Sequence, residues 1–509
     1  MGNWQEFVKN NCDKDGAFIK PEKDLMECFG IYPASVRSVG RVSCFIARDG
    51  INKVFVVTGG TSFDEFEGEL SSAGGMMVKV CPLSVKNSKV LRDVFPFTNP
   101  SSAKGHDISM GLGDRLGLAS AGHIRLIRDK DIFPILAQQS IRELNLTMRT
   151  YDDVLSDAVW AVFQEGYEKG FGADGDHLKT PDEVRMALDL GFTMITLDCS
   201  EHIDNSLEEL STEELSAKYE AMSDDDKCYW SDKYQGKTFK LGGGYEITVD
   251  EKEFYKTVLT YAEAISFAEH IYNDFIKDYP CEIDFEISID ETMNATSLQA
   301  HFIIAQEFDD RDVKMLNMAP RFCGEFQKGI DYKGDIAQFT RELEVHFAIS
   351  KHFGYKISVH SGSDKFSIFP IVGEVTGGKY HLKTAGTNWL EAMRVISKVN
   401  APLFREMYKH AVKRLPDAKK FYHIFTEVNM VPSIDGLSDS ELTSLMNIEE
   451  SRQAVHVTYG YLLCDKNDDG SYMFRDAFFD TLNEHEDEYY AALIKHIGHH
   501  IECLEENLF

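Results

Sequence analysis

The sequence predicts an α/β protein built on a (β/α)₈, TIM-like barrel. From about residue 96, short apolar runs typical of strands alternate with polar tips and helical stretches, which is the rhythm of βα units. Eight such runs occur, and that number favours a closed barrel over an open doubly wound sheet. None carries the glycine-rich turn and acidic partner of a dinucleotide fold, so nucleotide cofactors are disfavoured. The expected strands span 112–119, 133–138, 170–179, 192–198, 282–290, 313–322, 355–365 and 379–387.

The N-terminal part lies outside this rhythm. Residues 35–47 and 53–60 are extended runs, and an Arg-Asp-Gly turn signal at 48–50 separates them. Two such runs around a tight turn predict a β-hairpin. We therefore expect residues 1–95 to form a mixed α/β appendage that precedes the barrel.

Two helical segments interrupt and extend the barrel, which we expect to cover 96–400. An acidic insertion at 203–278 separates the fourth strand from the fifth. A long βα loop of this kind is either a lid over the active face or a surface elaboration, and the sequence does not choose between them. Residues 401–509 carry helical periodicity, and we expect this C-terminal extension to pack against the barrel wall.

Charge and composition restrict the partners. The 53 Lys and Arg against 84 Asp and Glu give a net charge of −31, and no basic stretch is present, which argues against nucleic acid. The same excess repels an anionic small molecule, so any acid-binding site must gather its own cations. The ten cysteines lack CxxC pairs, the chain starts without an apolar signal segment, and no apolar run approaches the roughly 20 residues of a spanning helix. We expect a cytoplasmic protein without a membrane partner, and the sequence leaves a homo-oligomeric state open.

Polar residues that end the expected strands are the first candidates for chemistry, because barrel active sites form at the carboxyl ends of strands. Strand alternation turns Asp176 and His177 to different faces unless the backbone bends there. His177 and His360 with an acidic residue would suit a divalent ion such as zinc or manganese, although each histidine alone is more often structural. The strand-end residues are Asp174, Asp176, His177, Lys179, Asp290, Glu291, Arg321, Glu325, Lys328, His360, Ser361, Ser363, Asp364, Lys365 and Lys383.

Basic residues near these ends could bind an anionic substrate, and each alone could equally be ordinary surface charge. The segments 111–125 and 137–150 are rich in Gly, Arg, Gln and Ser and could add a carboxylate or phosphate pocket. The expected substrate-binding residues are Arg142, Lys179, Arg321, Ser361, Lys365 and Lys383.

Several long segments occur in order between about 95 and 405. They read GLGDRLGLA with GHIR, AQQSIRE, VFQEGYEKGFGADGDHLKT, APRFCGEFQKG, SVHSGSDKFSIFP and HLKTAGTNWLEAMRV. Together they resemble the tagaturonate/fructuronate epimerase family, and their length makes this match far more specific than any single motif. The resemblance implies a metal-dependent isomerase that interconverts D-tagaturonate and D-fructuronate in hexuronate catabolism.

The resemblance also implies roles for individual residues. Asp176 is expected to be the proton acceptor, and His177 and His360 are expected to bind the metal. As the third metal ligand we expect Glu325 rather than His301.

The proton donor is expected at the end of the fifth strand, where we choose Glu291 over Asp290 and Glu286. The sequence departs from the family's pattern at Gly175, where Ala is expected, and this change should not disturb the chemistry. Two other functions stay open: another metal-dependent sugar-acid isomerase or aldolase, and a non-catalytic sugar-acid binding protein.

Overall fold

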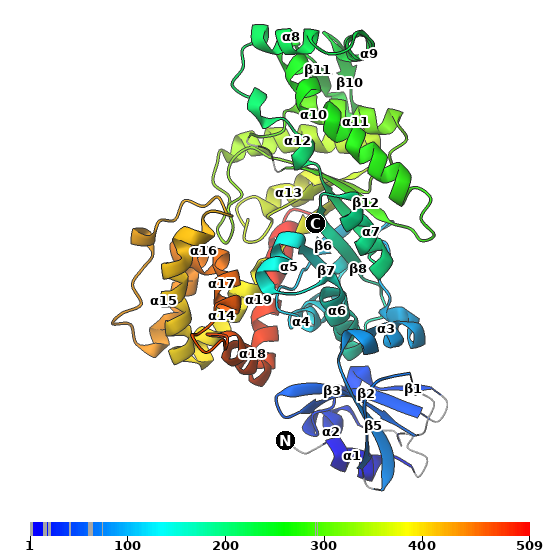
Figure 1. Ribbon diagram of the computed structural model, residues 1–509, viewed down its shortest axis with the longest axis vertical. Helices are drawn as coiled ribbons and strands as arrows, with labels where there is room; N and C mark the ends of the chain where they lie inside the picture. Colours follow the sequence, from blue (N-terminus) through cyan, green and yellow to red (C-terminus); the bar gives the residue numbers. More distant parts are fainter. Residues whose placement is uncertain are drawn as a thin grey trace.

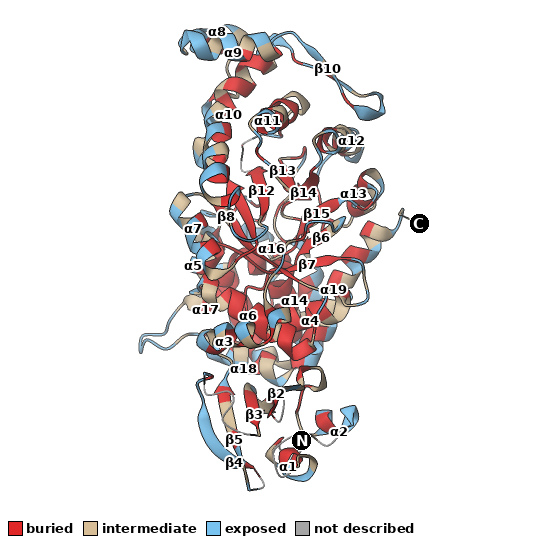
Figure 2. Ribbon diagram, turned by 90° about the vertical axis from the view of Figure 1, so that its right-hand side faces the viewer, coloured by how far each residue is buried: buried red, intermediate tan, exposed pale blue. Residues whose placement is uncertain are grey.

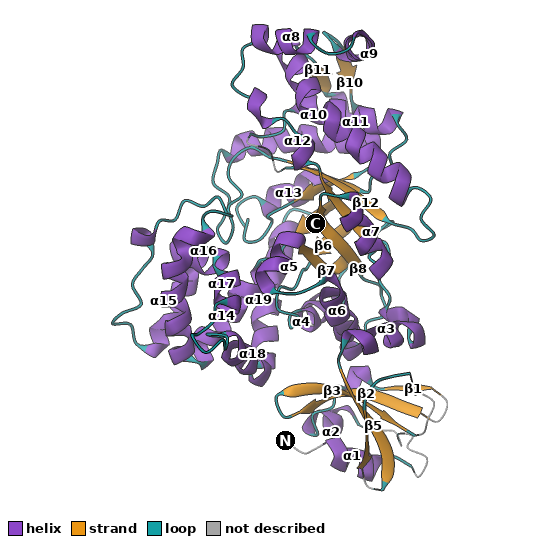
Figure 3. Cartoon of the chain, viewed as in Figure 1, coloured by secondary structure: helices purple, strands orange, loops and turns teal. Residues whose placement is uncertain are grey.

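The computed structural model describes residues 4–13, 18, 22–39, 42–59, 65–73, 75–290, 292 and 294–508. Its centre is a closed barrel of eight parallel strands, with an N-terminal sheet, a helical insertion and a C-terminal helical segment around it (Figure 1, Figure 3). The barrel strands follow one another in chain order, and the last pairs with the first, as the sequence predicts. They are β6 (Ile108–Gly111), β7 (Phe133–Ser140), β8 (Gly172–Leu178), β9 (Met194–Asp198), β12 (Asp284–Ile289), β13 (Asn317–Pro320), β14 (Lys356–Val359) and β15 (Tyr380–Lys383).

The first barrel strand lies earlier than the sequence predicts. The expected strand at 112–119 is wrong, because β6 ends at Gly111 and these residues form the loop that follows it. The Asp114 carboxylate accepts hydrogen bonds from the backbone N–H groups of Leu116 and Ala119, at 2.9 and 2.6 Å. A side chain therefore satisfies donors that a strand would have offered to its neighbours.

Helices cover the outside of the barrel and begin at identifiable caps. At α7, Thr180 accepts from the backbone N–H of Glu183 in a capping box, Pro181 occupies the first turn, and Gly191 ends the helix at φ 91°. This cap fixes the short connection that follows β8. The helices around the barrel are α4 (Ser120–Ile127), α5 (Ile141–Thr147), α6 (Tyr151–Glu165), α7 (Pro181–Leu190), α11 (Leu298–Asp310), α12 (Ile336–Phe353), α13 (Phe369–Thr376) and α14 (Thr387–Val399).

A five-stranded antiparallel sheet forms the N-terminal part of the molecule. Its order is β1-β2-β3-β5-β4, and the predicted hairpin is confirmed as the β2–β3 pair, with Asp49 opposite Asn52. Phe55 packs on Trp160 and Phe163 of α6, with ring centroids 5.5 and 5.6 Å apart. The elements are α1 (Trp4–Asn11), α2 (Lys23–Cys28), β1 (Arg37–Val39), β2 (Val42–Asp49), β3 (Asn52–Thr58), β4 (Glu69–Ala73), β5 (Met76–Pro82) and α3 (Val85–Val94).

A buried ion cluster also joins this sheet to the last helix of the chain, α19 (Glu486–Glu505). The Glu486 carboxylate, 7% exposed, forms ion pairs with Arg48 and Lys53 and accepts a hydrogen bond from the Tyr32 hydroxyl at 2.6 Å. Burial alone would raise the pKa of Glu486, but Lys53 and Arg48 outweigh it and lower the pKa to about 2.

The insertion projects from the barrel on the side opposite the N-terminal sheet (Figure 2). It consists of α8 (Thr212–Glu220), α9 (Asp224–Tyr234), the small hairpin of β10 (Thr238–Lys240) and β11 (Glu246–Thr248), and α10 (Glu251–Ile271). Glu307 of α11 holds it in place by accepting from the Tyr234 hydroxyl at 2.6 Å and pairing with Lys233 at 2.5 Å. The insertion therefore extends the outer wall of the barrel. It lines neither of the two cavities that open at the carboxyl ends of the barrel strands.

The C-terminal segment packs beside the barrel through a second apolar core, which includes Trp389, Phe404 and Tyr459. Its helices are α15 (Ala401–Ala418), α16 (Glu449–Val457), α17 (Tyr459–Cys464), α18 (Arg475–Glu484) and α19. Helix α16 contacts the loop that follows β13, where Arg452 Nε donates to the carbonyl of Gly329 at 2.9 Å. Among the described residues, no helix combines the length and apolar character that a membrane crossing requires.

Candidate active site and metal centre

Two adjoining cavities open at the carboxyl ends of the barrel strands. The inner cavity has a volume of about 70 Å³, and the outer cavity about 210 Å³. Both are lined by Arg142, Asp290, Lys328, His360 and Ser361. A larger cavity of about 890 Å³ lies between the N-terminal sheet and α6, but its described lining holds no histidine. The chemistry therefore belongs to the inner and outer cavities, where a barrel places its active site.

Asp176 and His177 both reach the inner cavity because β8 bends at its end. The pairing register between β8 and β9 shifts after Gly175, and His177 adopts a left-handed backbone conformation with φ 56°. The His177 Nδ1 lies 2.7 Å from Asp176 Oδ1. Packing favours glycine at position 175, because a Cβ there would lie 2.9 Å from Leu178 Cδ1.

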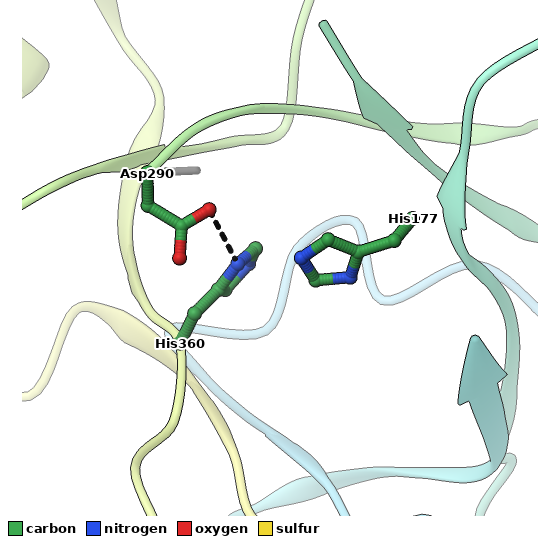
Figure 4. Close-up of side chains that lie close together, drawn as sticks. All are labelled: His177, Asp290 and His360. Carbon is green, nitrogen blue, oxygen red and sulfur yellow. Dashed lines mark ion pairs between the residues drawn. The ribbon is translucent and has the colours of Figure 1, made fainter. Parts of the chain in front are cut away.

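His177, Asp290 and His360 form a cluster of potential metal ligands (Figure 4). One ligand atom from each lies within 4.8 Å of the others. The two imidazole rings face one another with centroids 4.9 Å apart, and His360 Nδ1 lies 3.3 Å from Asp290 Oδ1. Two imidazoles and one carboxylate fit a divalent ion that keeps open positions for substrate.

A buried carboxylate orients each histidine of this cluster. Asp176 binds Nδ1 of His177, and Glu286 Oε1 lies 2.7 Å from Nε2 of His360. The other nitrogen of each ring is left to face the cluster, as in metal sites whose histidines are held by an outer carboxylate.

Lys383 is the buried counter-charge of the site, and its side chain is 5% exposed. Its ammonium lies 3.0, 2.7 and 2.8 Å from Asp174, Asp176 and Glu286. Asp290, which lies against His360, adds a fourth carboxylate to the site, so one ammonium stands against four carboxylates and three negative charges are left when both imidazoles are neutral. A divalent cation would offset most of that surplus.

The pKa values of these groups follow from burial and from Lys383. Burial raises the pKa of every carboxyl here, but Lys383 and the neighbouring histidines hold those of Asp176 and Glu286 well below their usual range. For Asp174, burial and the neighbouring Asp176 and Glu286 outweigh the effect of Lys383, and the pKa rises to about 6. For His360, burial opposes the charge, but Asp290 and Glu286 raise the pKa to about 10.

Not all predicted substrate-binding residues reach the cavities. Arg142 and Ser361 line both, Lys383 lines the inner cavity, and Arg321 lines the outer one. Lys179 instead turns towards the end of β9, where its ammonium donates to Ser200 Oγ at 2.9 Å and lies 3.5 Å from Asp198.

Lys365 is fully buried behind the cavity wall. Its ammonium donates to the backbone carbonyls of Gln327, Ile330 and Ser363, at 3.0, 2.6 and 2.9 Å. It therefore fastens two loops of the barrel mouth to one another and lines neither cavity. Burial lowers the pKa of this lysine to about 7.

The expected third ligand is not in the cluster. Glu325 lines the outer cavity, and its carboxylate lies 3.7 Å from His423. The alternative, His301, is buried between His346 and Tyr355, at 2.7 and 2.5 Å, and does not reach the mouth. Asp290, at the end of β12, occupies the third position instead. Glu291, the expected proton donor, lies outside the described residues.

A second group of potential ligands, Asp364, His496 and His500, is occupied by its own hydrogen bonds. Asp364 pairs with Arg452 at 2.7 Å and with His496 at 2.5 Å. The Asp364 N–H donates to His500 Nε2 at 3.0 Å, and His500 Nδ1 lies 2.9 Å from the carbonyl of His496. These contacts tie the loop after β14 to α16 and α19.

The inner cavity also contains residues that sequence reasoning missed. Arg115, Gln138 and His456 line it. The first two lie in the segments 111–125 and 137–150, which could add a carboxylate or phosphate pocket, but neither was a predicted site residue. His456 follows no strand and gave no signal, because α16 reaches the mouth from the C-terminal segment.

Comparison with known proteins identifies the family. The tagaturonate epimerase family model matches residues 32–504. A tagaturonate/fructuronate epimerase of Thermotoga maritima is 41% identical over 484 residues, covering 94% of this chain and 97% of that protein. The glycerol-bound crystal structure of a fructuronate-tagaturonate epimerase from Cohnella laeviribosi is 48% identical, with a TM-score of 0.91 and coverage of 95% and 98%. The native crystal structure of the same epimerase is also 48% identical, with a TM-score of 0.90, and the match covers 93% of this chain and 96% of that one. The chain belongs to the tagaturonate epimerase family.

Proposed function

We propose that this chain is an isomerase that interconverts D-tagaturonate and D-fructuronate in hexuronate catabolism, acting in the cytoplasm. The observation that carries the proposal is the cluster of His177, Asp290 and His360 at the barrel mouth, in a chain that matches epimerases of this name over nearly its whole length.

These three residues would hold a divalent metal, with Asp290 in the place first expected for Glu325. When bound, such an ion polarises a carbonyl or hydroxyl oxygen and stabilises negative charge that develops on it. Asp176 and Glu286 orient the two histidine ligands, and Lys383 keeps both carboxylates ionised.

The substrate chemistry limits the mechanism to two routes. The two ketouronates differ at the third carbon from the carboxylate, whereas the ketone is at the fifth, so enolisation does not acidify the hydrogen at the third carbon. In one route, the bond between the third and fourth carbons breaks, the resulting aldehyde rotates, and the bond forms again on its other face. In the other route, a base removes the hydrogen from the third carbon and an acid returns a proton to the opposite face.

Asp176 is the proton acceptor that we propose for either route. In bond cleavage it takes the hydroxyl proton of the third carbon as the carbon–carbon bond breaks and returns it when the bond forms. Its low pKa keeps it ionised at neutral pH, as an acceptor must be. Glu291 is the proposed proton donor of the second route.

The deciding experiment is incubation of metal-loaded protein with D-tagaturonate, followed by chromatographic separation of the products. We expect D-fructuronate to form, a chelator to stop the reaction, and Asp176→Asn to abolish it while the far-ultraviolet circular dichroism is unchanged. Release of an aldehyde fragment would instead indicate an aldolase, and binding without turnover would indicate a sugar-acid binding protein. Turnover in heavy water separates the routes, because bond cleavage introduces no deuterium at the third carbon.

A further inference from the structure

We infer that Arg115 and His456 form a subsite that binds the carboxylate of the sugar-acid substrate. Both side chains line the inner cavity, beside the cluster of His177, Asp290 and His360. Arg115 Nη1 and both ring nitrogens of His456 are buried and have no hydrogen-bond partner among the described residues. The inference deepens the proposed function, because it names the groups that select an acid over a neutral sugar.

Arg115 is 2% exposed and has one unpartnered nitrogen, which carries two N–H donors. Its Nε and Nη2 both donate to the same oxygen of Glu143, the first at 2.9 Å, and its guanidinium lies 4.2 Å from the ring centroid of Tyr459. The third nitrogen, Nη1, is buried and unpartnered among the described residues. A buried cationic donor without a partner is costly, so this position favours an anionic ligand.

His456 presents a neutral imidazole to the same cavity and is 1% exposed. Neither ring nitrogen has a hydrogen-bond partner among the described residues. Burial, together with Arg115 and Lys328, holds its pKa well below the usual range, so the ring carries one N–H donor and one acceptor. The chain makes room for this ring with Gly386, where a Cβ would lie 2.4 Å from the imidazole.

The carboxylate is the substrate group that fits this pair. The inner cavity, at about 70 Å³, is too small for a whole hexuronate and has room for a carboxylate with its nearest carbon. Three other cations line the inner cavity, and each has a contact of its own. Lys383 is paired with three carboxylates, Lys328 donates to Ser361 Oγ at 2.8 Å, and the Arg142 guanidinium lies 5.1 Å from the ring centroid of Tyr422. Glu143 pairs with the Nε edge of Arg115, so Nη1 is the nitrogen left for the substrate. A carboxylate accepts a charge-assisted hydrogen bond from Nη1, which is stronger than the bond that a neutral hydroxymethyl group would accept.

The test compares His456→Leu with His456→Gln, which keeps a donor and an acceptor. The assays measure KM for D-tagaturonate and the inhibition constant of D-tagatose, the neutral ketohexose with a hydroxymethyl group in place of the carboxylate. For His456→Leu we expect KM to rise about tenfold to a hundredfold, with an unchanged inhibition constant for D-tagatose and an equal or higher melting temperature, because an unsatisfied polar group has been removed. His456→Gln should recover most of the affinity.

His410→Leu is the matched control. It removes another imidazole of the C-terminal segment, on α15; this imidazole binds Asp465 and lines neither cavity. It should change neither constant. Calorimetric titration with D-altronate, which differs from D-tagaturonate only by a hydroxyl in place of the ketone, measures carboxylate binding without epimerisation. A protein that binds D-altronate through His456 but forms no D-fructuronate would therefore contradict only the proposed function. Equal losses for D-tagaturonate and D-tagatose, or no loss for either, would show that the pair encloses water and would overturn the subsite.

Discussion

Replacing Glu486 by Gln should destabilise the protein in a pH-dependent way. This carboxylate is buried against Arg48 and Lys53, and its pKa is lowered from 4.5 to about 2. That lowering corresponds to about 3 kcal/mol of stabilisation at pH 7. Because the folded state has the lower pKa, the stabilisation is fully present above pH 4.5 and is lost as the pH falls towards 2, with about 1 kcal/mol left at pH 3.

Scanning calorimetry of both proteins at pH 7 and pH 3 measures this difference. In a chain of this length, 1 kcal/mol shifts the melting temperature by about 1 °C, so we expect Glu486→Gln to melt about 3 °C lower at pH 7 and about 1 °C lower at pH 3. Glu488→Gln, an exposed change in the same turn of α19, is the matched control and should melt like the wild type. A Glu486→Gln protein that melts with the wild type at pH 7, or a deficit that grows on acidification, would refute the reasoning.

Four further outcomes test the site. Asp290→Asn should lower the bound metal and turnover at least tenfold, whereas Glu325→Gln should keep the metal. Elemental analysis of the purified proteins measures the bound metal. Metal loss in Glu325→Gln would instead support Glu325 as the third ligand. Lys383→Met leaves three buried carboxylates without a cation and should cost about 3–5 kcal/mol, read as a lower melting temperature. Lys365→Met leaves three loop carbonyls without their donor, so calorimetry should show a lower melting temperature. An unchanged melting temperature with a raised KM would instead show that Lys365 binds the substrate. Chelation should abolish activity and added zinc or manganese should restore it; activity that survives dialysis against chelator contradicts a metal-dependent reaction.

The barrel could be predicted because short, largely apolar strands alternate eight times with helical stretches, although polar residues of the site interrupt strands such as β8 and β12. The first strand could not, since the sequence around it contains a stronger apolar pattern in 112–119 than in β6. That pattern belongs to a loop whose N–H groups are satisfied by Asp114, a contact that is invisible in hydrophobic periodicity. The insertion was ambiguous for a similar reason, because its packing on α11 depends on Glu307, far away in the chain.

The site was predicted best where a single strand end supplies the geometry. Asp176 and His177 come together because one left-handed residue reverses the strand alternation. Glu325 was expected beside the two histidines, but Asp290 lies there, because the grouping depends on how two different strands are placed relative to His360, which sequence spacing does not contain. His456 lies still further beyond sequence reasoning, since it reaches the mouth only after the C-terminal helices have packed.

The contacts of Asp364 have a consequence for attempts to shorten the protein. The loop that carries His360 and Ser361 is anchored by Arg452 and by two histidines near the end of the sequence. A shortened enzyme that keeps all eight barrel strands would therefore lose the support of the loop that carries His360, one of the proposed metal ligands. Stop codons or proteolytic cuts within the last hundred residues should inactivate the protein as surely as changes at the mouth, so trimming this enzyme to a minimal barrel is the wrong starting point for redesign.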